Sequence, residues 1–236
     1  MKRIFVLCSI LLLLLSCLCG CVRNSSDSIS RFEFREIPWN ASVQETIEIL
    51  GVSADSVTYG EPYSSEGFSG QNIVIEGYDA FGCTAKYAIF CFEGYLGAEP
   101  GLAMIKFFYE DGTDPALLKS SITELYGEST DSFKEYTGYD GEDHWREVNS
   151  SDICTYWYSD VVLNNILSKR EKNAVLEYFS QEAKQPYPED SVQLYMNQPV
   201  ANIVLNTQYA HPEWYAEIVV GINGGNALFF EQLANP

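Results

Sequence analysis

The chain has 236 residues with 33 acidic and 14 basic side chains, which give a formal net charge of −19. Nucleic acid is excluded as an expected partner because phosphate binding requires clustered Lys and Arg, and an anionic membrane surface would repel this chain. The length is sufficient for one large domain or two small ones with a proper hydrophobic core.

The N-terminus has the pattern of an export signal. Lys2 and Arg3 precede an apolar run over 4–15, which is shorter than the roughly 20 residues that a bilayer-spanning helix needs. A basic start and a short apolar run are typical of a signal peptide. The run ends in Leu18-Cys19-Gly20-Cys21, where an ordinary secretory signal would place an Ala-x-Ala cleavage site.

Leu18-Cys19-Gly20-Cys21 resembles the lipobox of bacterial lipoproteins, in which an aliphatic residue and two small residues precede a cysteine. The resemblance implies that residues 1–20 are a signal peptide and that Leu18, Cys19 and Gly20 are recognised by the signal peptidase. It also implies that Cys21 is lipidated and anchors the protein at the extracytoplasmic face of the cell membrane, or at the outer membrane in a two-membrane host. Two acyl chains hold a protein stably where one is marginal. A plain secretory signal and an uncleaved membrane anchor are the alternatives.

Residues 21–31 are polar and rich in Ser, a composition typical of a flexible tether. We therefore expect the folded domain to occupy 32–236, with the lipid on Cys21 as its membrane partner and without help from a basic patch.

A short helix is predicted directly after Ser42. Ser42 as N-cap and Glu45 three residues later form a capping box, and Gly51 is a typical residue at the end of a helix. Trp39, just before this helix, is expected to pack on a sheet, with stacking on a ligand as the alternative. Three apolar residues repeat at helical spacing, namely Val43, Ile47 and Leu50.

Four strands are predicted after this helix, over 57–62, 72–80, 83–92 and 102–109. Aromatic and β-branched residues favour strands here, and the Gly- and Ser-containing segments between them favour turns. Alternate residues of the predicted strand 83–92 point to opposite faces of the sheet, and both of these faces carry apolar side chains. We therefore expect one face to meet a helix and the other to be partly covered.

A second helix is predicted after Asp114, which can act as N-cap with Pro115 in the first turn, and Gly127 marks its end. A helix followed by strands occurs twice along the chain. This recurrence is compatible with two tandem repeats, over 34–112 and 113–222, each consisting of a helix and an antiparallel meander. The apolar face of the second helix is predicted to consist of Leu118, Ile122 and Leu125.

The remaining chain gives weaker signals. Residues 136–152 are polar and predict a surface loop, 153–163 predict a strand, and 168–183 fit a helix or a strand. The last expected elements are a hairpin of 200–209 with 214–222, and a short strand over 227–230. Together the elements predict an α+β fold, with antiparallel sheet meanders and short helices packed on one side.

This order of elements behind a lipobox resembles two families of extracytoplasmic modules. One is the small lipoprotein of the outer-membrane barrel assembly machinery, and the other is the β-lactamase inhibitor protein family. The resemblance covers 34–133, with Asn40 and Val52-Ser53 as departures from the usual glycine and proline positions. It implies a binding or scaffolding role, and no functional residue is carried over. The matching positions are Phe34, Ile37, Val43, Ile47, Leu50 and Gly51.

The sequence offers little for catalysis or metal binding. His144 and His211 lie beside no nucleophile motif, and no paired His or Cys spacing indicates a zinc site. The acidic segments 110–114 and 140–143 could offer oxygens to Ca²⁺, but turn and cap roles are expected because neither has EF-hand spacing. No cofactor is expected.

Three cysteines lie in the predicted domain, Cys83, Cys91 and Cys154. On one strand Cys83 and Cys91 would be about 26 Å apart, too far for a disulfide, which needs Cα atoms within about 7 Å. Cys154 could pair with either one, but we expect buried free thiols.

The sequence therefore predicts a lipid-anchored, non-catalytic binding or scaffolding module of a bacterial cell envelope, with an envelope protein or polymer as partner. The alternative is an extracytoplasmic hydrolase that acts on glycans through paired carboxylates. The expected binding surface is an aromatic sheet face, with Tyr87, Phe90, Phe107, Phe108 and Tyr109 as candidates, although a core position is the favoured interpretation for any single one of them.

Overall fold

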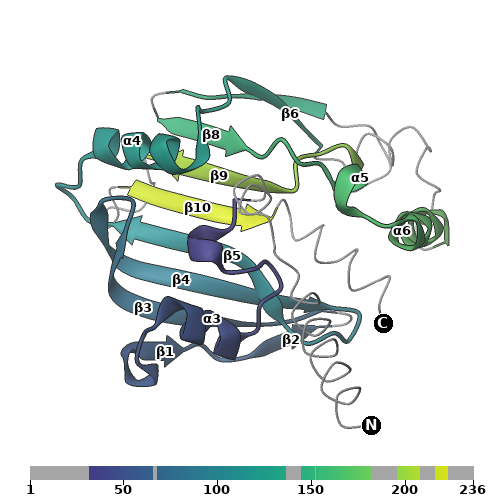
Figure 1. Ribbon diagram of the computed structural model, residues 1–236, viewed down its shortest axis with the longest axis horizontal. Coiled ribbons are helices and arrows are strands. Elements are labelled where there is room, and N and C mark those ends of the chain that lie inside the picture. The colour runs from purple at the N-terminus through teal and green to yellow at the C-terminus, as the bar shows by residue number, and fades with distance from the viewer. Residues whose placement is uncertain are drawn as a thin grey trace, which may run out of the picture.

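The computed structural model describes residues 32–65, 68–136, 145–151, 153–181, 196–207 and 216–222. They form an α+β fold in which an antiparallel sheet carries helices (Figure 1). The predicted signal peptide, lipobox and tether lie outside the described residues, as does the predicted strand over 227–230.

The main sheet has eight antiparallel strands in the order β1-β3-β4-β5-β10-β9-β8, with β2 paired to β3. Two meanders meet at its centre, since β3–β4–β5 and β8–β9–β10 each run through consecutive pairs and β5 pairs with β10. Strands are found in the predicted ranges 57–62, 72–80, 83–92, 102–109 and 153–163, and the first and the last of them are shorter than predicted. The two strands of the predicted C-terminal hairpin pair antiparallel. The strands are β1 (Val57–Tyr59), β2 (Tyr63–Ser65), β3 (Phe68–Ala80), β4 (Cys83–Tyr95), β5 (Gly101–Tyr109), β8 (Cys154–Tyr158), β9 (Ala201–Asn206) and β10 (Ala216–Ile222).

Local signals set the ends of the two helices that pack on the sheet, α3 (Val43–Leu50) and α4 (Pro115–Tyr126). The capping box of Ser42 and Glu45 is present, and Gly51 ends α3 with a φ of 64°. The Asp114 side chain accepts the N–H of Ala116 at the start of α4. Both helix predictions are confirmed because caps satisfy backbone groups that a helix leaves unpaired.

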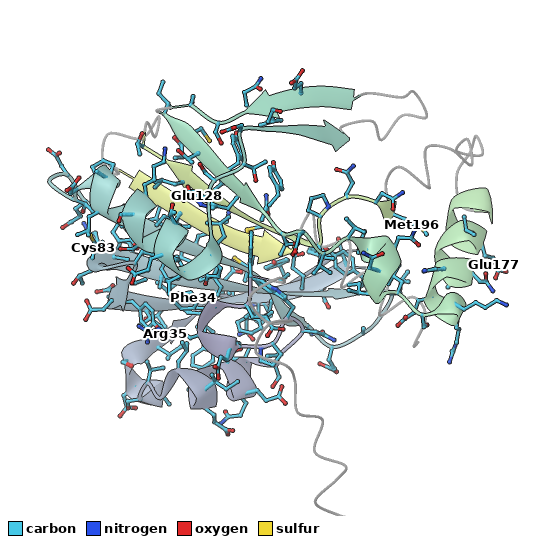
Figure 2. The ribbon with its side chains drawn as sticks, turned by 45° about the horizontal axis from the view of Figure 1, so that its top comes forward. Phe34, Arg35, Cys83, Glu128, Glu177 and Met196 are labelled. Carbon is cyan, nitrogen blue, oxygen red and sulfur yellow. The ribbon has the colours of Figure 1, made fainter. Side chains whose placement is uncertain are left out.

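One face of the sheet is covered. The same buried cluster contains Ile47 of α3, Ile122 of α4, and Phe90 and Phe107 of the sheet, so both helices lie on one side, as Figure 1 shows. Between them lies a 3-10 turn, η1 (Phe34–Glu36), whose Phe34 ring is 5.0 Å from that of Phe107 (Figure 2). A second 3-10 turn, η2 (Ala54–Ser56), precedes β1.

The prediction for Leu125 is wrong. Leu118 and Ile122 are fully buried, whereas Leu125 is 55% exposed, and Tyr126 packs against the core instead. Leu118 and Ile122 already define the buried stripe, and Tyr126 continues it at the i+4 position whereas Leu125 stands at i+3. Chemical type alone does not decide between the two.

The second half of the chain carries further elements. Strands β6 (Ser132–Tyr136) and β7 (Trp145–Asn149) form a separate hairpin, so the prediction of a loop throughout 136–152 is wrong. Three of the five residues of β7 are polar, namely Arg146, Glu147 and Asn149, so its composition gave no strand signal. The ambiguous 168–183 segment contains a helix, α6 (Lys169–Gln181), after the short α5 (Leu163–Ile166). Figure 2 shows α6, marked by Glu177, at the opposite end of the molecule from Cys83.

Each half of the sheet is thus a helix followed by a meander, although the second half also contains the β6–β7 hairpin, α5 and α6. The division into repeats over 34–112 and 113–222 stays a prediction.

Candidate functional site: the open face of the sheet

The face of the sheet opposite α3 and α4 is the candidate site, and we call it the open face. Alternation in the strands assigns to it the even-numbered residues of 68–76, the odd-numbered residues of 87–95, and the even-numbered residues of 104–108, 154–158 and 202–206. Most of these residues are half-buried, whereas their neighbours on the covered face are buried.

The strand register makes the open face continuous across the sheet. One row of directly paired residues runs Val74, Ile89, Lys106, Val219, Val204 and Tyr156, through β3, β4, β5, β10, β9 and β8. Directly paired residues on one face lie close enough to contact each other. The two meanders therefore contribute to a single surface.

The structure divides the five predicted aromatic candidates between the two faces. Tyr87 and Phe108 are paired across β4 and β5 on the open face and are half-buried. Phe90, Phe107 and Tyr109 are 0% exposed and belong to the core, which is the position that the sequence favours for any single candidate, so these three do not contribute to a binding surface. They stand one residue out of phase with Tyr87 and Phe108, and adjacent residues of a strand point to opposite faces.

Sequence reasoning missed other aromatic residues of this face. Tyr156 and Tyr158 on β8 stack with ring centroids 6.0 Å apart and an interplanar angle of 7°. The signal was the Tyr-x-Tyr alternation within the predicted strand 153–163, because residues two apart share a face.

A second aromatic group lies at the other side of the open face, where β2, β3 and β4 meet. The Phe68 ring centroid is 5.7 Å from that of Tyr63 and 5.3 Å from that of Tyr95. The Tyr95 hydroxyl donates to a carboxylate oxygen of Glu93 at 2.7 Å. Burial, the hydrogen bond to Glu93 and the Glu93 charge raise the pKa of Tyr95, so its hydroxyl stays protonated at neutral pH.

The outer edge of β8 is capped. Thr130 N–H donates to the Tyr156 carbonyl at 2.7 Å, and the Thr130 hydroxyl accepts the Tyr158 N–H at 3.2 Å. The Ser150 hydroxyl accepts the Tyr156 N–H at 3.0 Å. These bonds occupy edge groups that would otherwise pair with an added strand, so the face and not this edge is the candidate surface.

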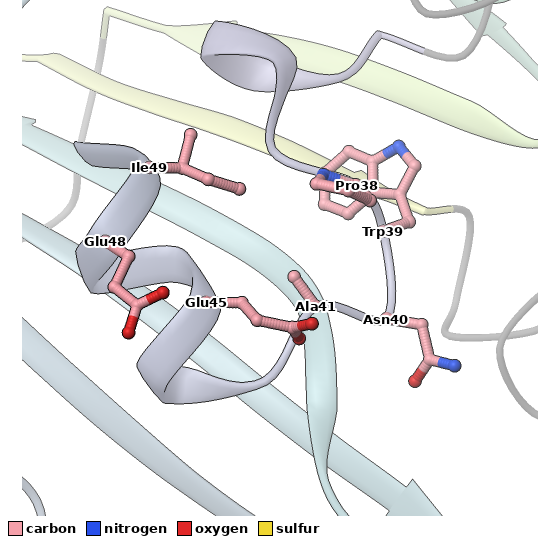
Figure 3. A pocket seen from close by; sticks show the side chains of 7 residues that line it. All are labelled: Pro38, Trp39, Asn40, Ala41, Glu45, Glu48 and Ile49. Carbon is pink, nitrogen blue, oxygen red and sulfur yellow. The ribbon is translucent and has the colours of Figure 1, made fainter. Parts of the chain in front are cut away.

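A hollow of about 530 Å³ lies on the other side of the sheet, beside α3 (Figure 3). Its lining contains two carboxylates, Glu45 and Glu48, so it can be compared with the paired carboxylates of a glycan hydrolase. Glu45 accepts hydrogen bonds from the backbone N–H and the hydroxyl of Ser42, and these bonds lower the pKa of its carboxyl. A general acid at neutral pH needs a raised pKa, so this site does not favour the hydrolase. The lining residues are Pro38, Trp39, Asn40, Ala41, Glu45, Glu48 and Ile49.

Trp39 is 6% exposed and belongs to the buried cluster. The prediction that it packs on the sheet is confirmed, and an indole buried to this extent offers little surface for stacking on a ligand.

Most of the other sequence-predicted residues are outside the part of the chain that the structure describes. Leu18, Cys19, Gly20, Cys21, His144 and His211 lie outside the described residues, as does 140–143. In 110–114, Glu110 forms an ion pair with Lys86 at 2.6 Å and Asp114 caps α4. Within the part of the chain that the structure describes, no group of three or more metal-ligating side chains exists.

The three cysteines of the domain are free thiols. Cys91 is buried as predicted, but Cys83 and Cys154 are half-buried, because both stand near the ends of the strand ladders.

No family model, curated protein or solved structure matches this chain. The resemblance to lipoproteins and to the two families of extracytoplasmic modules therefore stays a prediction from the sequence. No helix in the described ranges is long and apolar enough to cross a membrane.

Proposed function

We propose that this protein is a lipid-anchored, extracytoplasmic binding module of a bacterial cell envelope, which uses the open face to bind an envelope protein or polymer. The lipobox-like Leu18-Cys19-Gly20-Cys21 supports the anchor. The open face supports the binding role, and it is the observation that carries the proposal.

The two faces of the sheet are covered unequally, and this difference supports a binding role. The covered face buries aromatic residues such as Phe90 and Phe107 completely beneath α3, α4 and η1. The open face carries comparable side chains, among them Tyr87, Phe108 and Tyr156, that stay half-buried. Large contiguous apolar surfaces on a folded protein mark interaction sites more often than chance, and Tyr is enriched in interface cores.

The anchor is tested by replacing the lipidated residue. Cys21→Ala should abolish incorporation of radioactive palmitate, because no acyl chain can then be attached. The protein should then be either released from membranes or left unprocessed. Cys17→Ala changes a neighbouring cysteine and should leave labelling intact. Palmitate labelling of the Cys21→Ala protein would refute the anchor.

The binding surface is tested by photo-crosslinking on intact cells. A photoreactive phenylalanine at Tyr156 should yield a discrete crosslinked species, because this position lies on the open face. The matched control is Leu117, which is 44% exposed on α4 above the covered face. Equal crosslinking from both positions would contradict a binding role for the open face.

A further inference from the structure

We infer that Tyr63, Phe68, Glu93 and Tyr95 form a recognition site for the basic side chain of a lysine or arginine in a polypeptide partner. We call these four residues the cation cluster. The inference rests on the proposed function, because it assigns a partner chemistry to one end of the open face.

The cluster exists because a glycine separates two of its members. Tyr63 of β2 pairs directly with Gly70 of β3, and Gly70 pairs directly with Glu93 of β4. A Cβ atom on Gly70 would collide with the Tyr63 ring. The missing side chain therefore lets Tyr63 lie across β3 and reach the Glu93 row.

The next pair of residues on β3 and β4 provides the other two aromatic rings of the cluster. Phe68 pairs directly with Tyr95, and its ring lies within 6 Å of both tyrosine rings by centroid distance. Tyr63 is 40% exposed, so one ring of the cluster is open to a ligand. The faces of aromatic rings attract cations, and ammonium and guanidinium groups are the usual biological ones.

The carboxylate of Glu93 is placed to hold such a cation. It is half-buried and accepts the Tyr95 hydroxyl, but it forms no ion pair with any residue in the described part of the chain. Lys106 lies on the same face, but it pairs with Ile89, two rows away from Glu93. A charged side chain with little access to water is most stable beside an opposite charge.

Burial, Glu93 and Cys91 also raise the pKa of Tyr63. Both tyrosines therefore stay neutral hydrogen-bond donors around a single negative charge. A net charge of −19 over the whole chain further favours a basic partner through long-range attraction.

The shape of the surface favours a polypeptide as the source of the cation. Sites for small molecules are concave pockets, whereas the cluster lies at one end of a continuous sheet face. Protein interfaces are enriched in Tyr and Arg at their cores. A cationic glycan is the competing occupant, and it is tested directly below.

The test uses the full chain in detergent micelles with ring-labelled tyrosine, and follows the Tyr63 and Tyr95 resonances by NMR. The probes are acetyl-Gly-Lys-Gly-amide, the uncharged norleucine equivalent, and a glucosamine trimer. The lysine peptide should shift both resonances with a dissociation constant of about 1 mM or weaker, as expected for one exposed contact. The norleucine peptide should not shift them.

Two variants separate the site from general surface charge. Glu93→Gln keeps an acceptor for Tyr95 and should weaken lysine-peptide binding about five-fold. The matched control is Glu124→Gln, which removes the same charge from an exposed position of α4 on the other side of the sheet and should change binding less than about two-fold. Equal effects of the two variants, or equal binding of the norleucine peptide, would overturn the inference.

Gly70→Ala gives an independent variant if Glu93→Gln does not fold. The added methyl group should displace the end of the Tyr63 side chain and weaken lysine-peptide binding about two- to three-fold with the carboxylate intact. Unchanged binding in this variant would remove Tyr63 from the site. Tighter binding of the glucosamine trimer than of the lysine peptide would overturn the polypeptide assignment.

The failures of the two proposals are distinguishable. Crosslinking from Tyr156 together with lysine-peptide binding that Glu93→Gln does not weaken would refute the cation cluster and leave the proposed function standing. Lysine-peptide binding without any crosslink from Tyr156 would support the cluster and count against the wider open face.

Discussion

The two faces of the main sheet are built from neighbouring residues of similar chemistry. Phe107 is 0% exposed beneath η1, whereas Phe108, the next residue of the same strand, is half-buried on the open face. Phe90 and Ile89 show the same difference on β4. Hydrophobic type therefore does not separate core from surface in this sheet. The helices decide which of two apolar faces becomes the core.

The largest difference in stability is expected between the alanine variants of Phe107 and Phe108. Phe107→Ala should destabilise the protein by about 3–5 kcal/mol, because it leaves a cavity among Phe34, Tyr78 and Phe81. Phe108→Ala should cost less, about 1–2 kcal/mol, because Phe108 is only partly buried and its truncation on an open surface leaves no enclosed cavity. Urea denaturation of both variants measures the difference. Equal losses of stability would show that the open face is covered as firmly as the core.

The next contrast lies on the covering helix α4. Ile122→Ala should lower the free energy of unfolding by about 2–4 kcal/mol because the side chain is fully buried in the main cluster. Leu125→Ala, at a position that is 55% exposed, should change it by about 0.5 kcal/mol or less. A large loss of unfolding free energy in Leu125→Ala would show that Leu125 belongs to the buried face of α4, as expected from the sequence.

The rate at which cysteine thiols react tests how accessible the open face is to solvent. Burial raises the pKa of Cys91 to about 11, against a smaller opposing effect of Lys106, so about one thiol in a thousand is ionised at pH 8. Cys154 lies on the same face but is half-buried near its rim. We expect iodoacetamide to label Cys154 about 100-fold faster than Cys91, as measured by mass spectrometry of digested protein. Equal rates would mean that the centre of the face opens readily to solvent.

The smallest expected effect concerns the start of the covering helix α3. Ser42→Ala should cost about 1 kcal/mol at pH 7 through loss of the N-cap. The pKa of the Glu45 carboxyl is lowered by its hydrogen bonds to Ser42. The charged carboxylate therefore stabilises the fold fully above the ordinary pKa of about 4.3. This stabilisation is lost as the pH falls through the lower pKa of the folded state.

Ser42→Ala keeps the backbone N–H, which lowers the pKa of Glu45 most, and removes only the hydroxyl bond. The difference between Ser42→Ala and the unchanged protein should therefore shrink only in part below about pH 4, as followed by thermal melting at several pH values. Glu48→Gln is the control, since it removes a carboxylate from the same helix without changing the capping box. A difference that stays constant down to pH 3 would argue against a role for the Glu45 charge.

The features that could be predicted from the sequence are those governed by near neighbours. The capping box of Ser42 and Glu45, the Asp114 cap and the turn at Phe81-Gly82 all depend on residues within a few positions of one another. The turn has positive φ at both residues, 53° and 74°, which matches the twist of the strands that it joins. Alternation likewise predicted the strands, although it did not reveal β7 in a polar segment.

The candidate site was predicted only in part, because its residues are brought together by pairing over long distances. The sequence named five aromatic candidates and favoured a core position for any single one of them. Phe90, Phe107 and Tyr109 are in the core, whereas Tyr87 and Phe108 are on the open face. A strand with two apolar faces contains no information about which of them a helix will cover.

The sequence by itself determined the acidic charge, the lipobox-like start, the α+β class and the local ends of helices and turns. Only the tertiary structure decided that β5 pairs with β10 to join two meanders, that α3 and α4 cover the same side, and that Tyr63 crosses Gly70 toward Glu93. The physical reason is the separation along the sequence of the residues that interact. Caps and turns are fixed by bonds between near neighbours, whereas the open face and its cation cluster depend on strand register and helix packing across the whole domain.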